Sequence, residues 1–226
     1  MRATALVLLI ACGDAGAGGD PDAPPGDAPP GTPTAEQLLA RIATCDLVVG
    51  GPFARDAGGT ADVAICGFPG AVAWIADLDI DCDGKMSPQC NLMTDPAYMG
   101  QTAATDSHGD PLDAATLPFV VIPGRSARFD YLAAGLGMRS VVAVVYQGQV
   151  EYGVLGDVGP AAIIGEASYA MAERLGIDPD PATGGADGGV AYIAFTGAEA
   201  KVAVIEDHGA AVALGIDRAK QLLEAP

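Results

Sequence analysis

A β-hairpin signal in the middle of the chain constrains the fold more than any other feature. Residues 141–146 (VVAVVY) form an apolar run rich in β-branched side chains, and Gln147-Gly148 follows directly. Residues 149–154 (QVEYGV) then alternate polar and apolar side chains. A two-residue turn with glycine at its second position, placed between two such segments, is typical of antiparallel strands. The chain must therefore contain an antiparallel sheet.

The rest of the chain supplies more strand segments than helices. Four further segments have the composition of strands: 72–76, 119–122, 190–195 and 200–205. Three segments have helical patterns: about 35–44, 167–175 and 209–224. Thr34 and Gln37 have the spacing of a helix capping box, and Gly176 is placed to end a helix. This balance predicts a mainly β fold, a small barrel with a few peripheral helices.

The N-terminus has the features of a bacterial export signal. Residues 1–11 combine one basic residue with an apolar run that is too short to span a bilayer as a helix. Residues 9–12 (LIAC) resemble the lipobox of bacterial lipoproteins, in which the signal is cut before a cysteine that is then acylated. We therefore expect a signal peptide over 1–11 and lipid attachment at Cys12. An ordinary cleaved signal is the alternative.

The segment that follows the signal cannot contribute to a hydrophobic core. Beyond Cys12, residues up to 33 are Gly, Asp, Pro and Ala, apart from Thr32. This composition predicts a disordered Gly/Pro/Asp-rich tether over 12–33. The remaining residues, 34–226, are enough for a single domain with a sizeable core, and we expect that domain to be a monomer.

The chain is strongly acidic. Its 29 Asp and Glu residues outnumber 11 Lys and Arg residues, which gives a net charge of −18. Such a chain repels nucleic acid and anionic membrane surfaces, so we expect membrane contact only through the lipid anchor. A polycationic substrate would be attracted. The alternative explanation is that the acidity only keeps an exported protein soluble.

Besides Cys12, the chain has an even number of cysteines, which suggests two disulfides in an exported protein. They are Cys45, Cys66, Cys82 and Cys90. The short separations favour Cys45–Cys66 and Cys82–Cys90, although spacing does not exclude the two other pairings. Their spacing does not resemble a zinc site.

Aspartates recur at every second position in residues 77–84 (DLDIDCDG): Asp77, Asp79, Asp81 and Asp83. In an extended chain all four carboxylates would share one face, where their repulsion favours cations, water or a cationic ligand. The spacing also resembles the start of a calcium loop, but the twelfth position from Asp79 is Cys90 instead of Glu. A solvated acidic loop is the alternative, and we expect no metal and no cofactor.

Two later carboxylates stand in contrasting surroundings. Asp157 follows an apolar strand and has glycines close by on both sides, and Glu166 comes nine residues later at the predicted start of a helix. A turn would account for Asp157, and the helix dipole would account for Glu166. Cleavage of a glycosidic bond also needs two carboxyl groups, one protonated and one ionised. On these residues alone, the turn and the helix dipole are the favoured explanations.

Several segments together resemble the chitosanases of glycoside hydrolase family 75, in the family's order and at compatible spacing. They are residues 76–84, 100–103, 112–114 with 117–121, 152–157 and 165–168. The resemblance extends over roughly residues 70–197. The Asp-rich run and the Gly-Asp and Gly-Glu-Ala-Ser segments are specific in combination, and each alone would be weak.

The resemblance implies an endo-acting hydrolase of β-1,4-linked glucosamine polymers that works with inversion. The family's two essential carboxylates fall on Asp157, as general base, and Glu166, as general acid. Substrate-binding positions implied by the matching segments are Asp77, Asp79, Asp81, Asp83, Thr102 and Tyr152. Residues 86–98 and those after 197 match the family poorly, so the chain-length preference of the enzyme is not implied.

A more distant likeness concerns the fold. Residues 157–176 resemble the Asp-x-Gly-Pro segment of double-psi β-barrels, a fold shared by the rare lipoprotein A group, expansins and some endoglucanases. This likeness implies a six-stranded double-psi barrel with both carboxylates at one rim. Fold alone would not give the activity.

The expected function is hydrolysis of chitosan by an exported protein, anchored at the bacterial outer membrane or cell surface, or secreted. One alternative is a non-catalytic barrel lipoprotein that binds cell-wall glycan. Another is a hydrolase of a related polysaccharide, such as peptidoglycan or a β-glucan. The acidity of the chain favours a cationic polymer over both alternatives.

Overall fold

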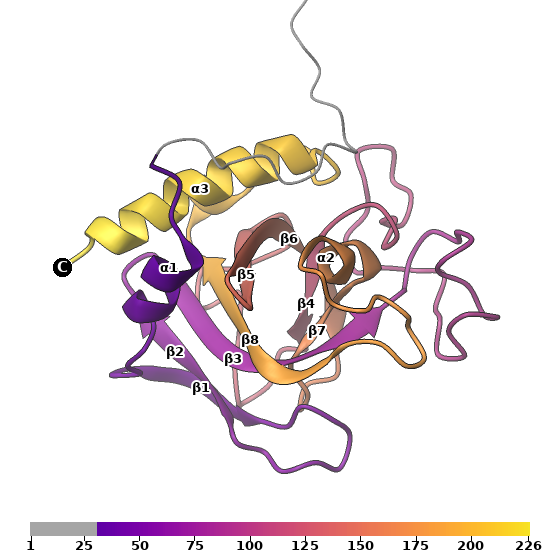
Figure 1. Ribbon diagram of the computed structural model, residues 1–226, viewed down its shortest axis with the longest axis horizontal. Helices are drawn as coiled ribbons and strands as arrows, with labels where there is room; N and C mark the ends of the chain where they lie inside the picture. Colours follow the sequence, from indigo (N-terminus) through magenta and orange to yellow (C-terminus); the bar gives the residue numbers. More distant parts are fainter. Residues whose placement is uncertain (1–30) are drawn as a thin grey trace, which may run out of the picture. The chain divides into compact units, whose positions relative to one another are not determined.

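Six strands close into a barrel (Figure 1). The computed structural model describes residues 31–226. Around the barrel the strand order is β3, β7, β4, β6, β5 and β8, and β8 pairs back onto β3. The strands are β3 (Ala71–Asp81), β4 (Phe119–Pro123), β5 (Val141–Tyr146), β6 (Gln149–Gly159), β7 (Glu166–Ser168) and β8 (Ala186–Phe195). The β3–β7 and β4–β6 pairs are parallel and the other pairs are antiparallel. The expected mainly β fold with a six-stranded barrel is confirmed.

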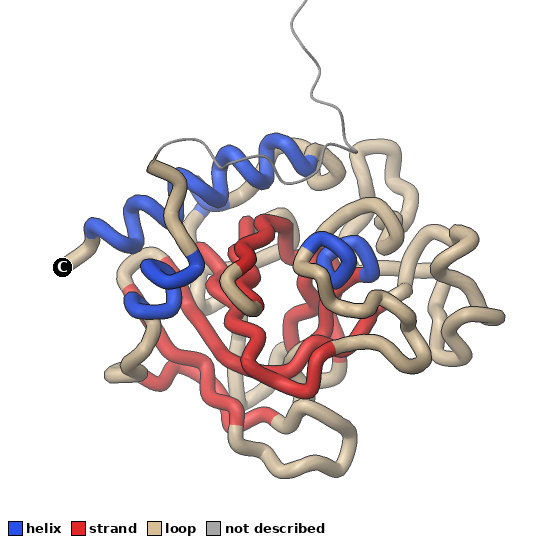
Figure 2. Tube along the Cα trace, in the orientation of Figure 1, coloured by secondary structure: helices blue, strands red, loops and turns tan. Residues whose placement is uncertain are grey.

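Two strands and three helices surround the barrel (Figure 2). β1 (Val48–Phe53) and β2 (Val63–Phe68) extend the sheet from β3. The helices are α1 (Ala35–Arg41), α2 (Tyr169–Arg174) and α3 (His208–Glu224), with a short 3₁₀ turn at Ala198–Ala200. The capping box at the start of α1 forms as predicted. Within residues 31–226, no helix has the length and apolar character needed to cross a membrane.

The predicted hairpin forms with its expected register. β5 and β6 pair from Val141↔Val154 to Tyr146↔Gln149, and the two turn residues both have positive φ, 44° at Gln147 and 85° at Gly148. Positive φ at both turn positions matches the right-handed twist of the strands. Because β5 is buried on both faces, almost every residue of this strand is apolar.

Alternate residues of the strands pack into two separate hydrophobic clusters. One cluster contains Val141, Ala143 and Val145 with residues of α1 and α3. The other contains Val142 and Val144 with residues of α2. The period-two alternation of a strand produces this division.

Two disulfides join neighbouring parts of the chain. Cys45 bonds to Cys66, which connects the segment before β1 to β2, and Cys82 bonds to Cys90 just after β3. This is the pairing that the short separations favour. The second bond fixes the chain as it leaves the barrel towards the long loops that follow β3 (Figure 2).

Two predicted elements differ from the structure. Residues 200–205 are not a strand: Lys201 makes an isolated bridge to Ser140, and Val202 and Ile205 are buried from irregular backbone. The predicted helix at 167–175 begins only at Tyr169, because residues 166–168 pair with β3 as β7. Backbone groups used in the sheet are not available to a helix.

Several expectations lie outside the described residues. They are the signal peptide over 1–11, lipid attachment at Cys12, and the tether over 12–33 for all but its last three residues. These stay predictions.

Candidate active site

One cavity collects most of the acidic residues that the sequence singles out. Its volume is about 820 Å³, and it lies where β3, β6 and β7 meet the loop after β3. Its acidic lining residues are Asp79, Asp81, Asp83, Asp95, Asp157 and Glu166. Within the described chain no Lys, Arg or His lines this cavity. The site therefore gathers acidic groups without a basic side chain among them.

Asp157 lies near the end of β6, where backbone N–H groups contact its carboxyl group. It is a strand residue, not the turn residue that its glycine neighbours would suggest, and only 8% of its surface is exposed. Its Oδ1 accepts hydrogen bonds from the backbone N–H groups of Ala103 and Val158, both at 2.7 Å. Such bonds favour the ionised carboxylate.

Glu166 comes from β7 and faces the same cavity. In the parallel β3–β7 pair, Glu166 lies opposite Asp79. Because it belongs to a strand, and Ser168 is the residue that caps α2, the helix dipole does not explain Glu166. Its Oε2 lies against Gly159, where a Cβ would be only 2.8 Å away.

Ser168 anchors the short strand that carries Glu166. The fully buried hydroxyl donates to the carbonyl of Leu117 at 2.8 Å. It accepts from the N–H groups of Phe119 at 2.9 Å and Met171 at 3.2 Å. One side chain thus joins β7 to the start of β4 and caps α2, which fixes the backbone two residues beyond Glu166.

The two carboxyl groups differ in how strongly they hold a proton. Burial raises the pKa of Glu166 to about 7, and repulsion from Asp79 and Asp83 adds to this effect. Burial also raises the pKa of Asp157, but the two backbone N–H bonds oppose the rise. Of the two, Glu166 is therefore the carboxyl group that burial and neighbouring charge favour in its protonated form, while the N–H bonds to Asp157 favour its ionised form.

The Asp-rich run lines the cavity only in part. Asp79, Asp81 and Asp83 are lining residues, and burial raises the pKa of each carboxyl group. Asp81 accepts from the N–H of Asp83 at 2.7 Å, and Asp83 accepts from the N–H of Met99 at 2.6 Å. These bonds hold the loop after β3 in its place in the cavity lining.

The run does not form the calcium loop that its spacing resembles. The twelfth position counted from Asp79, Cys90, is bonded to Cys82, and the aspartates up to Asp81 belong to a strand. A calcium loop needs a bidentate carboxylate at the position of Cys90 and a chain that turns back on itself.

Two of the predicted substrate-binding residues lie outside the cavity, and the hydroxyl of a third is held by the backbone. Thr102 lines the cavity, but its hydroxyl donates to the carbonyl of Ala104 and accepts from the N–H of Leu112. Asp77 is buried and is not among the cavity-lining residues. Tyr152 is buried beneath α3, where Gly215 leaves room for its ring. With 4% of its surface exposed, Tyr152 does not reach a substrate in the cavity.

Sequence reasoning missed two features of the site. Asp95 lines the cavity and accepts from the N–H of Ala97 at 2.8 Å, although it lies in the stretch that matches the family poorly. Gly159 provides the space occupied by the Glu166 carboxyl group. Only the acidic character of Asp95 and the glycine content around Asp157 hint at them in the sequence.

A second large cavity offers no comparable chemistry. It has a volume of about 670 Å³ and an apolar lining that includes Leu47, Val49 and Phe129. Its one carboxylate, Asp130, forms an ion pair with Arg125 at 2.6 Å. An ionised, paired carboxylate is poorly suited to proton transfer, so the acidic cavity is the better candidate.

Curated fungal proteins are similar to this chain over part of their length. Endo-chitosanase B from Aspergillus oryzae is 37% identical to this chain over 132 residues, which are 55% of each protein. The endo-chitosanase of Aspergillus fumigatus is 32% identical over 142 residues, 57% of this chain and 60% of that protein. The chain thus spans about half the length of the curated relatives it matches.

One solved structure and one family profile complete the comparison. The Streptomyces papain inhibitor aligns with 56% of this chain and 98% of its own, with 17% identity and a TM-score of 0.33, which is too low to support an argument. The profile described as "Fungal chitosanase of glycosyl hydrolase group 75" matches residues 78–217. The match includes both Asp157 and Glu166 and covers more than half of the sequence, and the chain therefore belongs to the chitosanase family of glycosyl hydrolase group 75.

Proposed function

We propose that this protein is an endo-chitosanase that hydrolyses β-1,4 bonds between glucosamine units with inversion at the anomeric carbon. The observation that carries the proposal is the pair formed by Asp157 and Glu166 in one acidic cavity. Burial raises the pKa of Glu166 to about 7, whereas two backbone N–H groups oppose the rise in the pKa of Asp157. Membership of the family and the names of the Aspergillus relatives support chitosan as the substrate.

In the proposed reaction, Glu166 is the general acid. It gives its proton to the glycosidic oxygen as the bond from that oxygen to the anomeric carbon breaks. Asp157 is the general base and takes one proton from a water molecule on the opposite face of the sugar. The oxygen of that water forms the new bond to the anomeric carbon, so the configuration inverts. Proton exchange with solvent restores both carboxyl groups.

The acidic lining suits a polycationic substrate. Asp79, Asp81, Asp83 and Asp95 would attract the protonated amines of glucosamine units along the cavity. Neutral β-glucans gain nothing from such a field, and anionic polymers are repelled by it. The net charge of −18 extends this preference to the whole chain.

The proposal also includes the organisation of the chain. A signal peptide over 1–11, a lipid anchor at Cys12 and the tether would present residues 34–226 outside the cell as one catalytic domain. The two disulfides are consistent with an oxidising compartment, where such bonds persist.

The substrate is tested by incubating the purified protein with chitosan, a neutral β-glucan and peptidoglycan. We expect a rapid fall in the viscosity of the chitosan solution, and short glucosamine oligomers identified by mass. The other two polymers should stay intact. Binding of chitosan without any fall in viscosity would support a glycan-binding barrel instead and would contradict the proposal.

The pKa of Glu166 predicts the alkaline limit of activity. The general acid must be protonated, so kcat should fall as the pH rises through about 7, the raised pKa of Glu166. The general base must be ionised, so kcat should also fall at low pH, as Asp157 takes up a proton above its usual pKa range. The measurement is kcat at saturating soluble glucosamine oligomer, with EDTA present. A kcat that is constant or rises between pH 6 and 9 would contradict the roles given to the two residues.

A further inference from the structure

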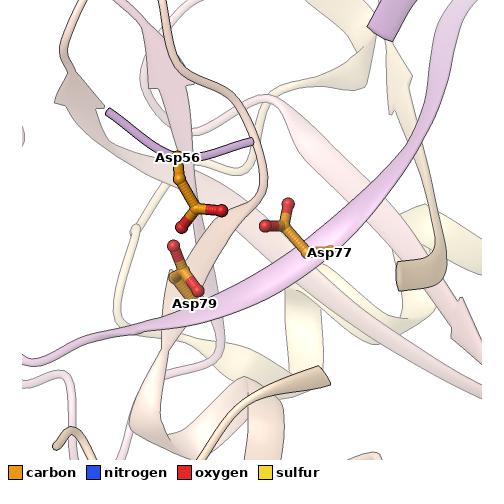
Figure 3. Close-up of side chains that lie close together, drawn as sticks. All are labelled: Asp56, Asp77 and Asp79. Atoms are coloured by element: carbon orange, nitrogen blue, oxygen red, sulfur yellow. The ribbon is translucent and has the colours of Figure 1, made fainter. Parts of the chain in front are cut away.

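Three aspartates lie together beside the acidic cavity, and only one of them lines it. Asp77 and Asp79 come from β3, and Asp56 comes from the connection between β1 and β2. One carboxylate oxygen from each residue lies within 4.8 Å of the others. Figure 3 shows the three carboxyl groups pointing towards a common centre.

One carboxyl oxygen of Asp77, Oδ1, is buried without a hydrogen-bond partner among the described residues. Only 5% of the Asp77 surface is exposed. A buried carboxylate oxygen without a partner is costly, and such a group is normally paired or bound to a metal. A cation bound to this carboxyl group would offset that cost.

The surrounding structure prevents Asp77 from turning towards solvent. A Cβ at Gly165 would lie only 2.0 Å from the Asp77 Oδ1, so the glycine backbone packs directly against the carboxyl group. The hydroxyl of Tyr192 donates to the backbone carbonyl of Asp77 at 2.7 Å. Asp77 is thus fixed with its carboxyl group facing Asp56 and Asp79 (Figure 3).

Among residues 31–226, no side chain forms an ion pair with the three aspartates. Arg55 is the cation adjacent to Asp56 in the chain, and its guanidinium donates to Asp62 at 2.8 Å instead. Arg55 therefore attracts Asp77 only from a distance, and within the described residues the cluster has no directly paired cation.

A small ion fits this position better than a sugar amine does. Asp79 lines the acidic cavity, but Asp56 and Asp77 do not, so a polymer in the cavity would meet only one member of the cluster. Carboxylate oxygens are the ligands that Ca²⁺ prefers, at about 2.3–2.6 Å. Two such ligands on opposite sides of the ion are about 5 Å apart, comparable with the spacing of these oxygens.

We propose that Asp56, Asp77 and Asp79 form a calcium site that ties the β1–β2 connection to β3. Two of the three ligands are exposed, so water would complete the coordination. The expected dissociation constant is that of extracellular calcium modules, about 10⁻⁴–10⁻³ M. The site concerns the resting protein, so it is tested without substrate and independently of the proposed hydrolysis.

The test is isothermal titration of the full-length protein with CaCl₂ after EDTA treatment and dialysis. We expect one ion per chain in the stated range and a higher Tm in calcium. Asp56→Asn removes an exposed ligand without disturbing the core and should weaken binding at least about tenfold. Asp217→Asn, an exposed position on α3, makes the same change of charge and should leave the affinity within twofold of the original protein.

Three results would overturn the proposal. One is absence of binding by the original protein at 5 mM CaCl₂. Another is unchanged affinity in the folded Asp56→Asn variant, which would show non-specific attraction to an acidic chain. The third is Mg²⁺ binding as tightly as Ca²⁺, which would contradict the choice of ion.

Discussion

Asp157→Asn and Glu166→Gln are each expected to lower kcat on chitosan by about 10²–10⁴-fold, because each change removes a group that moves a proton in the transition state. Both amides are close in shape to the acids they replace. The cavity and the binding of substrate should therefore survive, and KM should change much less than kcat. The measurement is the rate of reducing-end formation at saturating substrate.

Stability provides a check that the Glu166→Gln variant is folded. The pKa of Glu166 is about 7 in the folded protein, above its value in the unfolded chain. At pH 8 the folded protein must keep this buried group ionised, which disfavours folding, and glutamine removes that cost. The variant should therefore melt at a higher temperature than the original protein at pH 8. The difference should shrink as the pH falls through 7 and disappear well below 4.5, the ordinary pKa of glutamate, where the carboxyl group is protonated in both states.

Glu173→Gln is the matched control for Glu166→Gln. Glu173 is an exposed residue of α2 outside the acidic cavity. The Glu173→Gln variant should therefore keep the activity and melting temperature of the original protein. If either Asp157→Asn or Glu166→Gln kept more than a tenth of the original kcat while folded, the assignment of the pair would be wrong.

Gly159→Ala is expected to lower kcat by about 10–100-fold with little loss of stability. The new methyl group would lie 2.8 Å from the Oε2 of Glu166 and 3.0 Å from Val121 Cγ1. The end of the glutamate side chain moves more easily than the backbone, so the clash should displace the general acid. Misplacement of a reacting group by about 1 Å can cost about 10²-fold in rate. The measurement is kcat together with Tm.

Gly188→Ala is the control for this change. Gly188 is also a strand glycine, in β8, but a Cβ there would meet nothing within 4 Å. The kcat of the Gly188→Ala variant should equal that of the original protein. If the Gly159→Ala variant retained full activity, the Glu166 carboxyl group would not need the position that it occupies in this structure.

The elements predicted well are those whose signals are local. The capping box at Thr34, the apolar alternation of β5 and β6, and the turn at Gln147-Gly148 all act within a few residues. Interactions between residues close in sequence stabilise these elements, so the sequence alone is enough to predict them. The two disulfide pairings are predicted for the same reason, because each joins cysteines that are close in sequence.

The elements predicted poorly depend on partners that are distant in sequence. Glu166 resembles a helix start, yet it is a strand residue because Asp79, 87 positions earlier, pairs with it. Lys201 has a strand-like neighbourhood but only a single bridge partner, Ser140. Tyr152 belongs to a matching segment, and only the packing of α3 shows that it is covered.

The sequence predicts which residues belong to the candidate site, but it does not predict how their side chains are arranged in space. Asp157 and Glu166 stood out through the family's segments, while their contrasting environments depend on the Ala103 N–H and on burial in the barrel. Nothing in the sequence around Asp56 indicates that it belongs to a site. It lies in a Gly-rich loop and meets Asp77 only because the β1–β2 connection passes β3.

Proton NMR of the sugar products during the first minutes of chitosan hydrolysis tests the central claim most directly. Hydrolysis of a β-1,4 bond with Glu166 as acid and Asp157 as base places the water oxygen on the opposite face, so the new reducing ends should appear first as the α-anomer. They should then equilibrate with the β-anomer. First appearance of the β-anomer, or intact chitosan after prolonged incubation with folded protein, would contradict the account.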